Sequence, residues 1–317
     1  MNFAAPLLKP LLLHIPDGFL SLPIALFFWA ISLAMILLAA KRTQDQLGER
    51  QIPLTGVMAA FIFAAQMINF PVAGGTSGHL LGGVLAAVTL GPWAGMLVMT
   101  SVIGVQALLF QDGGLLAMGA NIFNMGLLTV LIGYGLYRGV ANMSKSLHLA
   151  IAGVAAWLSV VAGALTTSLQ VWLSGSALLE VITPAMLGVH VLIGIGEGLI
   201  TVAALAFILQ TRPDLISAQQ VRNGSRGWVI VGILVSIGVV FLAPLASANP
   251  DGLERVATDL GFFQHSQEAP YQALPDYTIP GLGETPLSTI IAGAVGALLV
   301  AATIMLLVRV LKQPKKI

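Results

Sequence analysis

Long runs of apolar residues recur along the chain and leave little sequence between them. At a rise of about 1.5 Å per residue, most of them could form a helix that crosses a bilayer core of about 30 Å. Hydrophobic residues make up 57% of the 317 residues and charged residues only 9%, a balance that suits lipid. We therefore expect an all-α integral membrane protein. Its predicted spans are 20–40, 53–70, 79–90, 92–110, 114–138, 149–173, 186–210, 228–247 and 288–308.

One pair of these runs is interrupted by Gly91 and Pro92. Because proline ends or kinks a helix, we expect a short helix over 79–90, only about 18 Å long, and a full-length helix over 92–110. A helix that is too short to cross the bilayer is tolerated where it borders a cavity lined by protein. The region around this pair is therefore of functional interest.

The basic residues indicate the orientation of the chain. If the N-terminus lies outside, all but two of the 14 Lys and Arg residues fall in inner loops, and only Lys9 and Arg255 lie outside. Positive charge accumulates in cytoplasmic loops, so we expect the N-terminus outside and the C-terminus inside. The polar residues and loops of the outer side are then His14, Asp17, 71–79, Asp112, Glu180 and 248–287.

Several classes of site and activity are excluded by what the sequence lacks. It contains no cysteine, so disulfides and thiolate metal sites are impossible. It contains neither the P-loop pattern G-x-x-x-x-G-K-[ST] nor the metalloprotease pattern H-E-x-x-H. A net charge of +1 gives no indication of a nucleic-acid partner. We therefore expect that the chain is not an enzyme. Any metal site in it must use histidine, carboxylate, amide or backbone groups.

Two outer segments combine histidine with residues that bend the backbone. In LLLHIPDGFL (11–20), His14 precedes a proline and an Asp-Gly pair typical of turns. In NFPVAGGTSGHLLGG (69–83), glycines let the backbone bend, and His79 lies at the expected start of the next helix. The alternative for His79 is a solvated histidine in a flexible turn. The segment FQDGG (110–114) predicts by itself only a turn.

Polar residues also lie inside the predicted spans. His190 and Glu197 are seven residues apart, so they share one helix face. Ionisable groups within a membrane are often functional, but hydrogen bonding between helices is the alternative, which we favour for Glu197. The same two interpretations apply to TSLQ (167–170). Asn121 and Asn124 are expected to join helices.

Several motifs, in order, closely resemble the CbiM/NikM family, the membrane substrate-capture components of energy-coupling-factor transporters for cobalt and nickel. They are HIPDGFLS, FIFAAQMINFPVAGGTSGHLLGG, GPWAG, ALLFQDGG and GANIFNMG, and the resemblance covers about 14–210. Farther along, ANPDGLERVA (248–257) resembles the PDGLE motif of the small N-type partner, here apparently fused to the same chain.

The resemblance implies a division of the chain into four parts. An N-terminal extension (1–12) precedes a metal-capture membrane domain of about seven helices (13–212). A cytoplasmic linker (213–227) leads to a PDGLE-type part (228–317), in which two helices enclose an outer loop. The proline- and glycine-rich sequence of that loop (248–287) predicts irregular structure, either solvated or docked on the capture domain. We assign no ligands there.

The resemblance also implies the metal ligands. Family members begin Met-His-Ile-Pro, and the free amine, the backbone nitrogen and the ring nitrogen of that histidine bind the metal together with a loop histidine. The matching residues are His14 and His79, and four nitrogens in a plane suit Ni(II), with Co(II) also possible. Leu13 precedes His14, so its amine can contribute only as an N-terminal residue. We expect such a start, which makes 1–12 a start-site artefact; otherwise this member binds metal differently.

The function that the resemblance implies is import of Ni(II) or Co(II) across the cell membrane. The metal is the substrate, and no permanently bound cofactor is expected. ATPase subunits and a coupling transmembrane subunit would come from other chains, and membrane lipid would surround this one. One alternative is a stand-alone secondary metal transporter or channel, in which His190 and Glu197 relay protons or ions. Another is a membrane scaffold or chaperone whose histidines are incidental.

Overall fold

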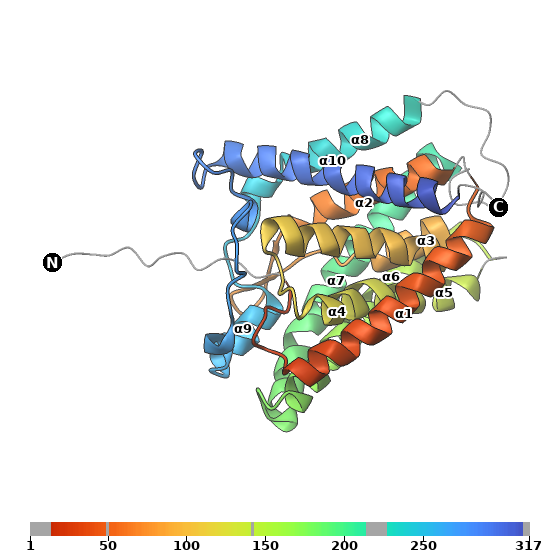
Figure 1. Ribbon diagram of the computed structural model, residues 1–317. Coiled ribbons are helices and arrows are strands. Elements are labelled where there is room, and N and C mark those ends of the chain that lie inside the picture. Colours follow the sequence, from red (N-terminus) through yellow and green to blue (C-terminus); the bar gives the residue numbers. More distant parts are fainter. Residues whose placement is uncertain (1–13, 49–50, 141–142, 214–226, 313–317) are drawn as a thin grey trace, which may run out of the picture.

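The computed structural model describes residues 14–48, 51–140, 143–213 and 227–312. It is a bundle of long helices that run roughly along one direction (Figure 1). The α-helices are α1 (Leu22–Gln46), α2 (Ile52–Gln66), α3 (Gly83–Val105), α4 (Met118–Asn121), α5 (Thr129–Arg138), α6 (Lys145–Leu173), α7 (Leu179–Thr211), α8 (Gly227–Val240), α9 (Gly252–Asp259) and α10 (Pro286–Leu311). The π-helical segment η2 (Gln106–Phe110) extends α3, and η3 (Ile122–Leu128) joins α4 to α5. The antiparallel strands β1 (Phe70–Val72) and β2 (Thr76–Gly78) form a small hairpin.

The predicted all-α membrane class is confirmed. Seven helices in the described part of the chain are long and apolar enough to cross a membrane, and Ile52–Gln66 is a shorter apolar helix. Large apolar side chains on the outside of the bundle are exposed, as in Leu37 (65%) and Leu199 (67%), which suits contact with lipid. The chain is therefore a multi-pass membrane protein.

The predicted break at Gly91 is present inside the span Gly83–Phe110. Gly91 has φ 76° and ψ 174°, which no helical residue adopts. A Cβ on Gly95 would lie 3.2 Å from the backbone of Ala86, so the helices on either side of Gly91 fold back against each other. The short helix begins at Gly83, not at His79 as predicted. Gly82 has φ 82°, and the residues from His79 to Gly82 belong to no helix or strand, which leaves His79 in a non-helical segment.

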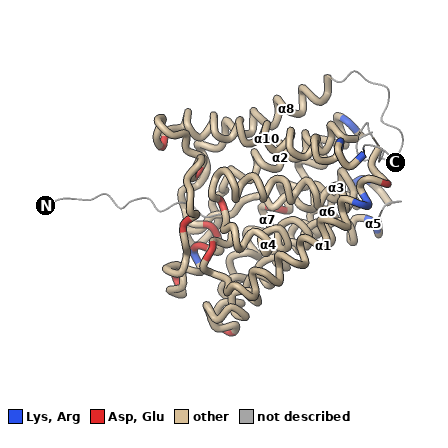
Figure 2. The backbone as a smooth tube through the Cα atoms, viewed as in Figure 1, with Lys and Arg blue, Asp and Glu red and all other residues tan. Residues whose placement is uncertain are grey.

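Charged side chains separate along the bundle. Figure 2 shows most Lys and Arg residues at one end of the bundle and most Asp and Glu residues at the opposite end, around α9. This is the separation that the distribution of basic residues in the sequence predicts. We call the end that carries α9 the outer end, in keeping with the expected orientation of the chain.

The two halves of the chain share one core. In α10, Gly296 has no side chain, and a Cβ there would lie 2.2 Å from the ring of Phe63 in α2. Gly232 of α8 meets Val57 of α2 in the same way. Because these glycines let the helices approach closely, α8 and α10 pack against α2. The PDGLE-like half is therefore an integral part of the bundle.

The outer segment between α8 and α10 is more ordered than the sequence predicted. It contains α9, and Leu253, Val256 and Ala257 on one side of this helix are buried. Their spacing of three and four residues is that of an amphipathic helix. Asp251 caps the helix by accepting a hydrogen bond from Glu254 N at 2.8 Å. The expectation of an irregular loop was wrong for these residues, although docking on the other half was one of the two predicted outcomes.

Candidate functional site

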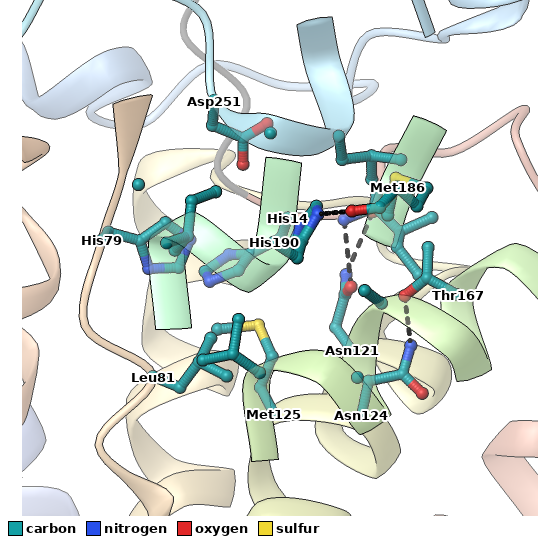
Figure 3. A pocket seen from close by; sticks show the side chains of 18 residues that line it. His14, His79, Leu81, Asn121, Asn124, Met125, Thr167, Met186, His190 and Asp251 are labelled. Atoms are coloured by element: carbon teal, nitrogen blue, oxygen red, sulfur yellow. Dashed lines mark hydrogen bonds between the residues drawn. The ribbon is translucent and has the colours of Figure 1, made fainter. Parts of the chain in front are cut away.

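A cavity of about 80 Å³ lies between the capture half and α9. Three of the five histidines of the chain line it, namely His14, His79 and His190, and the carboxyl group of Asp251 lines it as well (Figure 3). The lining residues come from the segment before α1, from β2 and the segment after it, from α4 and η3, from α6 and α7, and from α9 with the residue before it. The site is thus assembled from parts of the chain that lie far apart in the sequence.

His14 is buried, with 2% of its surface exposed, and the residues that follow it are held in place by hydrogen bonds. The backbone N–H of Ile15 donates to Asn121 Oδ1 at 3.0 Å, and Asn121 Nδ2 donates to the Ile15 carbonyl at 3.0 Å. The Asp17 carboxylate accepts hydrogen bonds from the backbone N–H groups of Leu115 and Ala117, both at 2.9 Å. Asn121, which was expected to join helices, instead fixes the segment that carries His14.

The ring of His14 pairs with Asp112. Its Nδ1 atom lies 2.8 Å from the Asp112 carbonyl oxygen and 3.2 Å from Asp112 Oδ1. A carbonyl oxygen can only accept, so Nδ1 carries the proton. Nε2 of His14 is buried and has no hydrogen-bond partner among the described residues. Only Nδ1 could close a six-membered chelate ring with the backbone nitrogen of the same histidine, as the resemblance implies. In this arrangement, however, Nε2 is the ring nitrogen without a partner.

The electrostatics of this pair favour its charged form. Burial opposes protonation of His14, but the Asp112 carboxylate outweighs it, and the pKa of His14 is raised above its usual value. Burial likewise opposes ionisation of Asp112, but His14 outweighs it, and the pKa of Asp112 is lowered. The hydroxyl of Tyr277 donates to Asp112 Oδ2 at 2.9 Å. A tyrosine from the outer segment of the second half therefore supports His14 through Asp112.

His79 lies beside His14, as the resemblance to the CbiM/NikM family implied. The two ring centroids are 5.7 Å apart, with the rings perpendicular. His79 is 7% exposed, so the alternative of a solvated histidine is wrong. Its Nδ1 atom lies 3.0 Å from the Leu80 carbonyl oxygen.

The segment that follows His79 is held by a buried carboxyl group. Glu197 of α7 is fully buried and accepts hydrogen bonds from Leu81 N at 2.6 Å and Gly82 N at 3.0 Å. Gln66 Nε2 donates to the Leu81 carbonyl at 2.8 Å. The favoured hydrogen-bonding interpretation of Glu197 is confirmed, but its partners are backbone groups of this segment and not another helix.

His190 reaches the same cavity from α7. Its Nδ1 atom lies 2.8 Å from the Met186 carbonyl oxygen, one helical turn earlier, so Nδ1 carries the proton. A Cβ on Gly252 of α9 would lie 2.8 Å from His190 Cε1, so the absence of a side chain there lets α9 close over this ring.

Amide groups join the helices on another side of the cavity. Asn124 Nδ2 donates to Gln170 Oε1 at 2.7 Å, and Gln170 Nε2 donates to Asn124 Oδ1 at 2.9 Å. Asn124 Nδ2 also lies 3.1 Å from Thr167 Oγ1 (Figure 3). The expectation that Asn124 joins helices is confirmed. Thr167 and Gln170 of the TSLQ segment are its partners, in line with the hydrogen-bonding interpretation of that segment.

The outer side of the cavity is covered by the segment that precedes α9. The backbone N–H of Ser77 in β2 donates to the Pro250 carbonyl at 2.8 Å, and its hydroxyl donates to the Asn249 carbonyl at 2.8 Å. Ser77 and Asp251 form a parallel bridge. Asp251 is 5% exposed, and its burial raises the pKa of the carboxyl group to about 8.

The predicted ligands are thus partly brought together. His14 and His79 are neighbours, whereas Leu13 lies outside the described residues. In the part of the chain that the structure describes, no three His, Cys, Asp or Glu side chains are already positioned around a common metal ion. Sequence reasoning missed the contributions of Asp112 and Asp251. The Asp-Gly turns at both positions were the available signal.

Comparison with known proteins agrees with this architecture. Residues 14–215 match the CbiM family, described as the cobalt uptake substrate-specific transmembrane region, and residues 226–313 match the PDGLE domain. A relative from Archaeoglobus fulgidus, named as a fused nickel transport protein NikMN, is 38% identical over 295 residues, which cover 92% of this chain and 96% of that protein. A relative from Sorangium cellulosum, named cobalt transport protein CbiM, is 31% identical over 219 residues, covering 66% and 96%.

A solved structure shows the same fold in part. The crystal structure of a truncated transition metal transporter matches with a TM-score of 0.56 and 33% sequence identity, over 62% of this chain and 98% of that one. The motifs, the helical bundle and these similarities agree with one another. The chain belongs to the CbiM family, whose relatives are named as cobalt and nickel transport proteins, and it carries a PDGLE domain fused behind the CbiM region.

Proposed function

We propose that this chain is the metal-binding membrane component of an ATP-driven, energy-coupling-factor importer of Ni(II) or Co(II). The observation that carries the proposal is the pair of buried histidines, His14 and His79, whose rings lie 5.7 Å apart beside a covered cavity near the outer end of the bundle. Imidazole nitrogen is a preferred ligand of Ni(II), and it also binds Co(II). The names of the relatives, nickel and cobalt transport proteins, agree with this cargo.

The ligands in this proposal are His14, His79 and, in a chain that begins at residue 13, the free amine of Leu13. A free amine binds Ni(II) far better than an amide nitrogen, so such a chain should bind the ion more tightly than the 317-residue chain. N-terminal sequencing of the natively expressed protein and Ni(II) titration of both chains test this part. Equal affinities would exclude a role for the amine.

The energy for transport would come from other chains, namely ATPase subunits and a coupling transmembrane subunit. The sequence contains no P-loop, which supports this division of labour. The ion would be captured at the outer end, the component would reorient, and the partners would drive release on the inner side. The exposed apolar surface of the bundle would contact lipid and the coupling subunit.

The main alternative is a stand-alone secondary transporter or channel. It would use His190 and Glu197 to relay protons or ions, but both carboxyl oxygens of Glu197 accept backbone hydrogen bonds in this structure. That engagement favours a structural role. Uptake of Ni(II) and Co(II) into vesicles, with and without the ATPase subunits, distinguishes the two. Uptake that depends on ATP and on those subunits is expected, and uptake by this chain alone would exclude the importer mechanism.

A further inference from the structure

His190 is the one histidine of the cavity to which the proposed function gives no role. We propose that His190 supplies a third imidazole, through its Nε2 atom, to the Ni(II) or Co(II) ion held by His14 and His79. This inference rests on the proposed function and deepens it, because it names a further ligand of the same ion. It applies to the 317-residue chain, in which the N-terminal amine is far from His14 in sequence.

The first argument is the common state of the three rings. Nδ1 of His14, His79 and His190 lies 2.8, 3.0 and 2.8 Å from the carbonyl oxygens of Asp112, Leu80 and Met186. Each carbonyl can only accept, so each Nδ1 holds a proton, and Nε2 bears the lone pair once the ring is neutral. For His14, the metal must therefore displace the Nε2 proton that the neighbouring Asp112 carboxylate favours. A second ring nitrogen that donates to a carbonyl or carboxylate is the usual arrangement of metal-binding histidines.

The second argument is the position of the Nε2 atoms. Nε2 of His14 is buried beside the cavity and has no hydrogen-bond partner among the described residues. No hydrogen bond within the described part of the chain engages Nε2 of His190 either. For His14, whose Nε2 is buried, a ring nitrogen without a partner is costly in an apolar surrounding. A metal ion in the cavity would satisfy it.

The third argument is the distance that the rings must cover. With metal–nitrogen bonds of about 2.0–2.1 Å, two imidazoles on one ion have ring centroids roughly 4.5 to 6.5 Å apart. The centroids of His14 and His79 are 5.7 Å apart, which falls within this range. His190 lines the same cavity of about 80 Å³, and Figure 3 shows its ring close to the other two. Since the three side chains do not yet surround a common point, binding requires the rings to turn toward the ion.

The fourth argument is charge. Three neutral imidazoles leave the two positive charges of the ion uncompensated in a buried cavity. The Asp112 carboxylate contacts His14 from behind, in the carboxylate–histidine–metal arrangement found in metal sites. Asp251 also lines the cavity, and a bound cation would favour the ionised form of its carboxyl group. The surroundings of the three histidines are therefore suited to a divalent cation.

The test uses the full 317-residue protein without a histidine tag, purified in detergent and loaded with Ni(II). X-ray absorption spectroscopy counts the imidazoles bound to the metal, and competition with a chelating dye gives the affinity. We expect three imidazoles in the wild-type protein and two in His190→Gln. Loss of a residue that only supports a metal ligand weakens metal binding by about 10- to 100-fold. Loss of a direct ligand in His190→Gln should therefore weaken Ni(II) binding by at least about 10-fold.

His265→Gln is the matched control, because His265 is exposed, lies in the outer segment and does not line the cavity. It should retain wild-type affinity and three imidazoles. Two or fewer imidazoles in the wild-type protein overturn the role of His190, even if His190→Gln fails to fold, and so does an unchanged affinity in a folded His190→Gln. In either case Ni(II) binding by the wild-type protein still supports the proposed function. Failure of the wild-type protein to bind Ni(II) or Co(II) would instead overturn both.

Discussion

Glu197 offers a quantitative test of how the segment that carries His79 is held in place. Its two carboxyl oxygens accept the backbone N–H groups of Leu81 and Gly82 in a fully buried position. In Glu197→Gln, the amide oxygen can keep one of these bonds, while the NH₂ group faces the other N–H. One orphaned buried donor costs about 1–3 kcal/mol. Glu197→Ala orphans both donors, so its cost should be about 2–6 kcal/mol.

The expected order of thermal stability in detergent is therefore wild type, Glu197→Gln, Glu197→Ala. Glu180→Gln is the matched control, because Glu180 is exposed in the first turn of the same helix, and it should melt like the wild type. Metal affinity, measured on folded protein, should fall less than stability in Glu197→Gln. If both Glu197 variants have the same melting temperature as the Glu180→Gln control, the hydrogen bonds to Leu81 and Gly82 do not stabilise the fold. Loss of binding at unchanged stability would assign Glu197 to the metal site.

Three further predictions follow from the cavity. His79→Ala should abolish tight Ni(II) binding while the protein remains folded, and unchanged affinity by calorimetry would contradict this. Because Asp112 raises the pKa of His14, protons compete with the metal for its ring. Ni(II) affinity should rise with pH through the pKa of His14, and Asp112→Asn should move this rise to lower pH; a pH series of titrations that shows no displacement would refute the pairing. Gly252→Val would bring a side chain against His190 Cε1, which lies 2.8 Å from the site of a Cβ. The substitution should destabilise the packing of α9 over the cavity by about 1–3 kcal/mol. We therefore expect faster dissociation of the metal from the variant in stopped-flow measurements.

Much of the architecture could be predicted from the sequence because lipid imposes a strong and local signal. A helix in a bilayer must be apolar along its length, so the spans are visible one at a time. The break at Gly91 was equally visible, because Pro92 cannot continue a helix. The start of the short helix was not, since Leu80 and Leu81 are as apolar as the helix they precede. Leu81 instead uses its backbone groups for hydrogen bonds to the side chains of Gln66 and Glu197, which come from distant parts of the chain.

The site was less predictable because it is assembled from distant segments. His14 and His79 were singled out through a resemblance of motifs, and no local pattern indicates that their rings meet. Asp112 was interpreted as a plain turn, yet the turn at Gln111 (φ 54°) and Gly113 (φ 103°) places its carbonyl and carboxylate on His14. Asp251 was similarly hidden, because its role depends on the pairing of its segment with β2, more than 170 residues earlier.

The pairing of Ser77 with the segment from Asn249 to Asp251 has a consequence for how the cavity is covered. Its hydrogen bonds go to the carbonyl groups of the segment, in the manner of a peptide that adds to the edge of a sheet. Such a short pairing would bind weakly between separate molecules. Here α8 and α10 anchor both ends of the segment in the same bundle, so a high effective concentration replaces intrinsic affinity. The cover can therefore stay closed for most of the time, although the pairing itself consists of only a few hydrogen bonds.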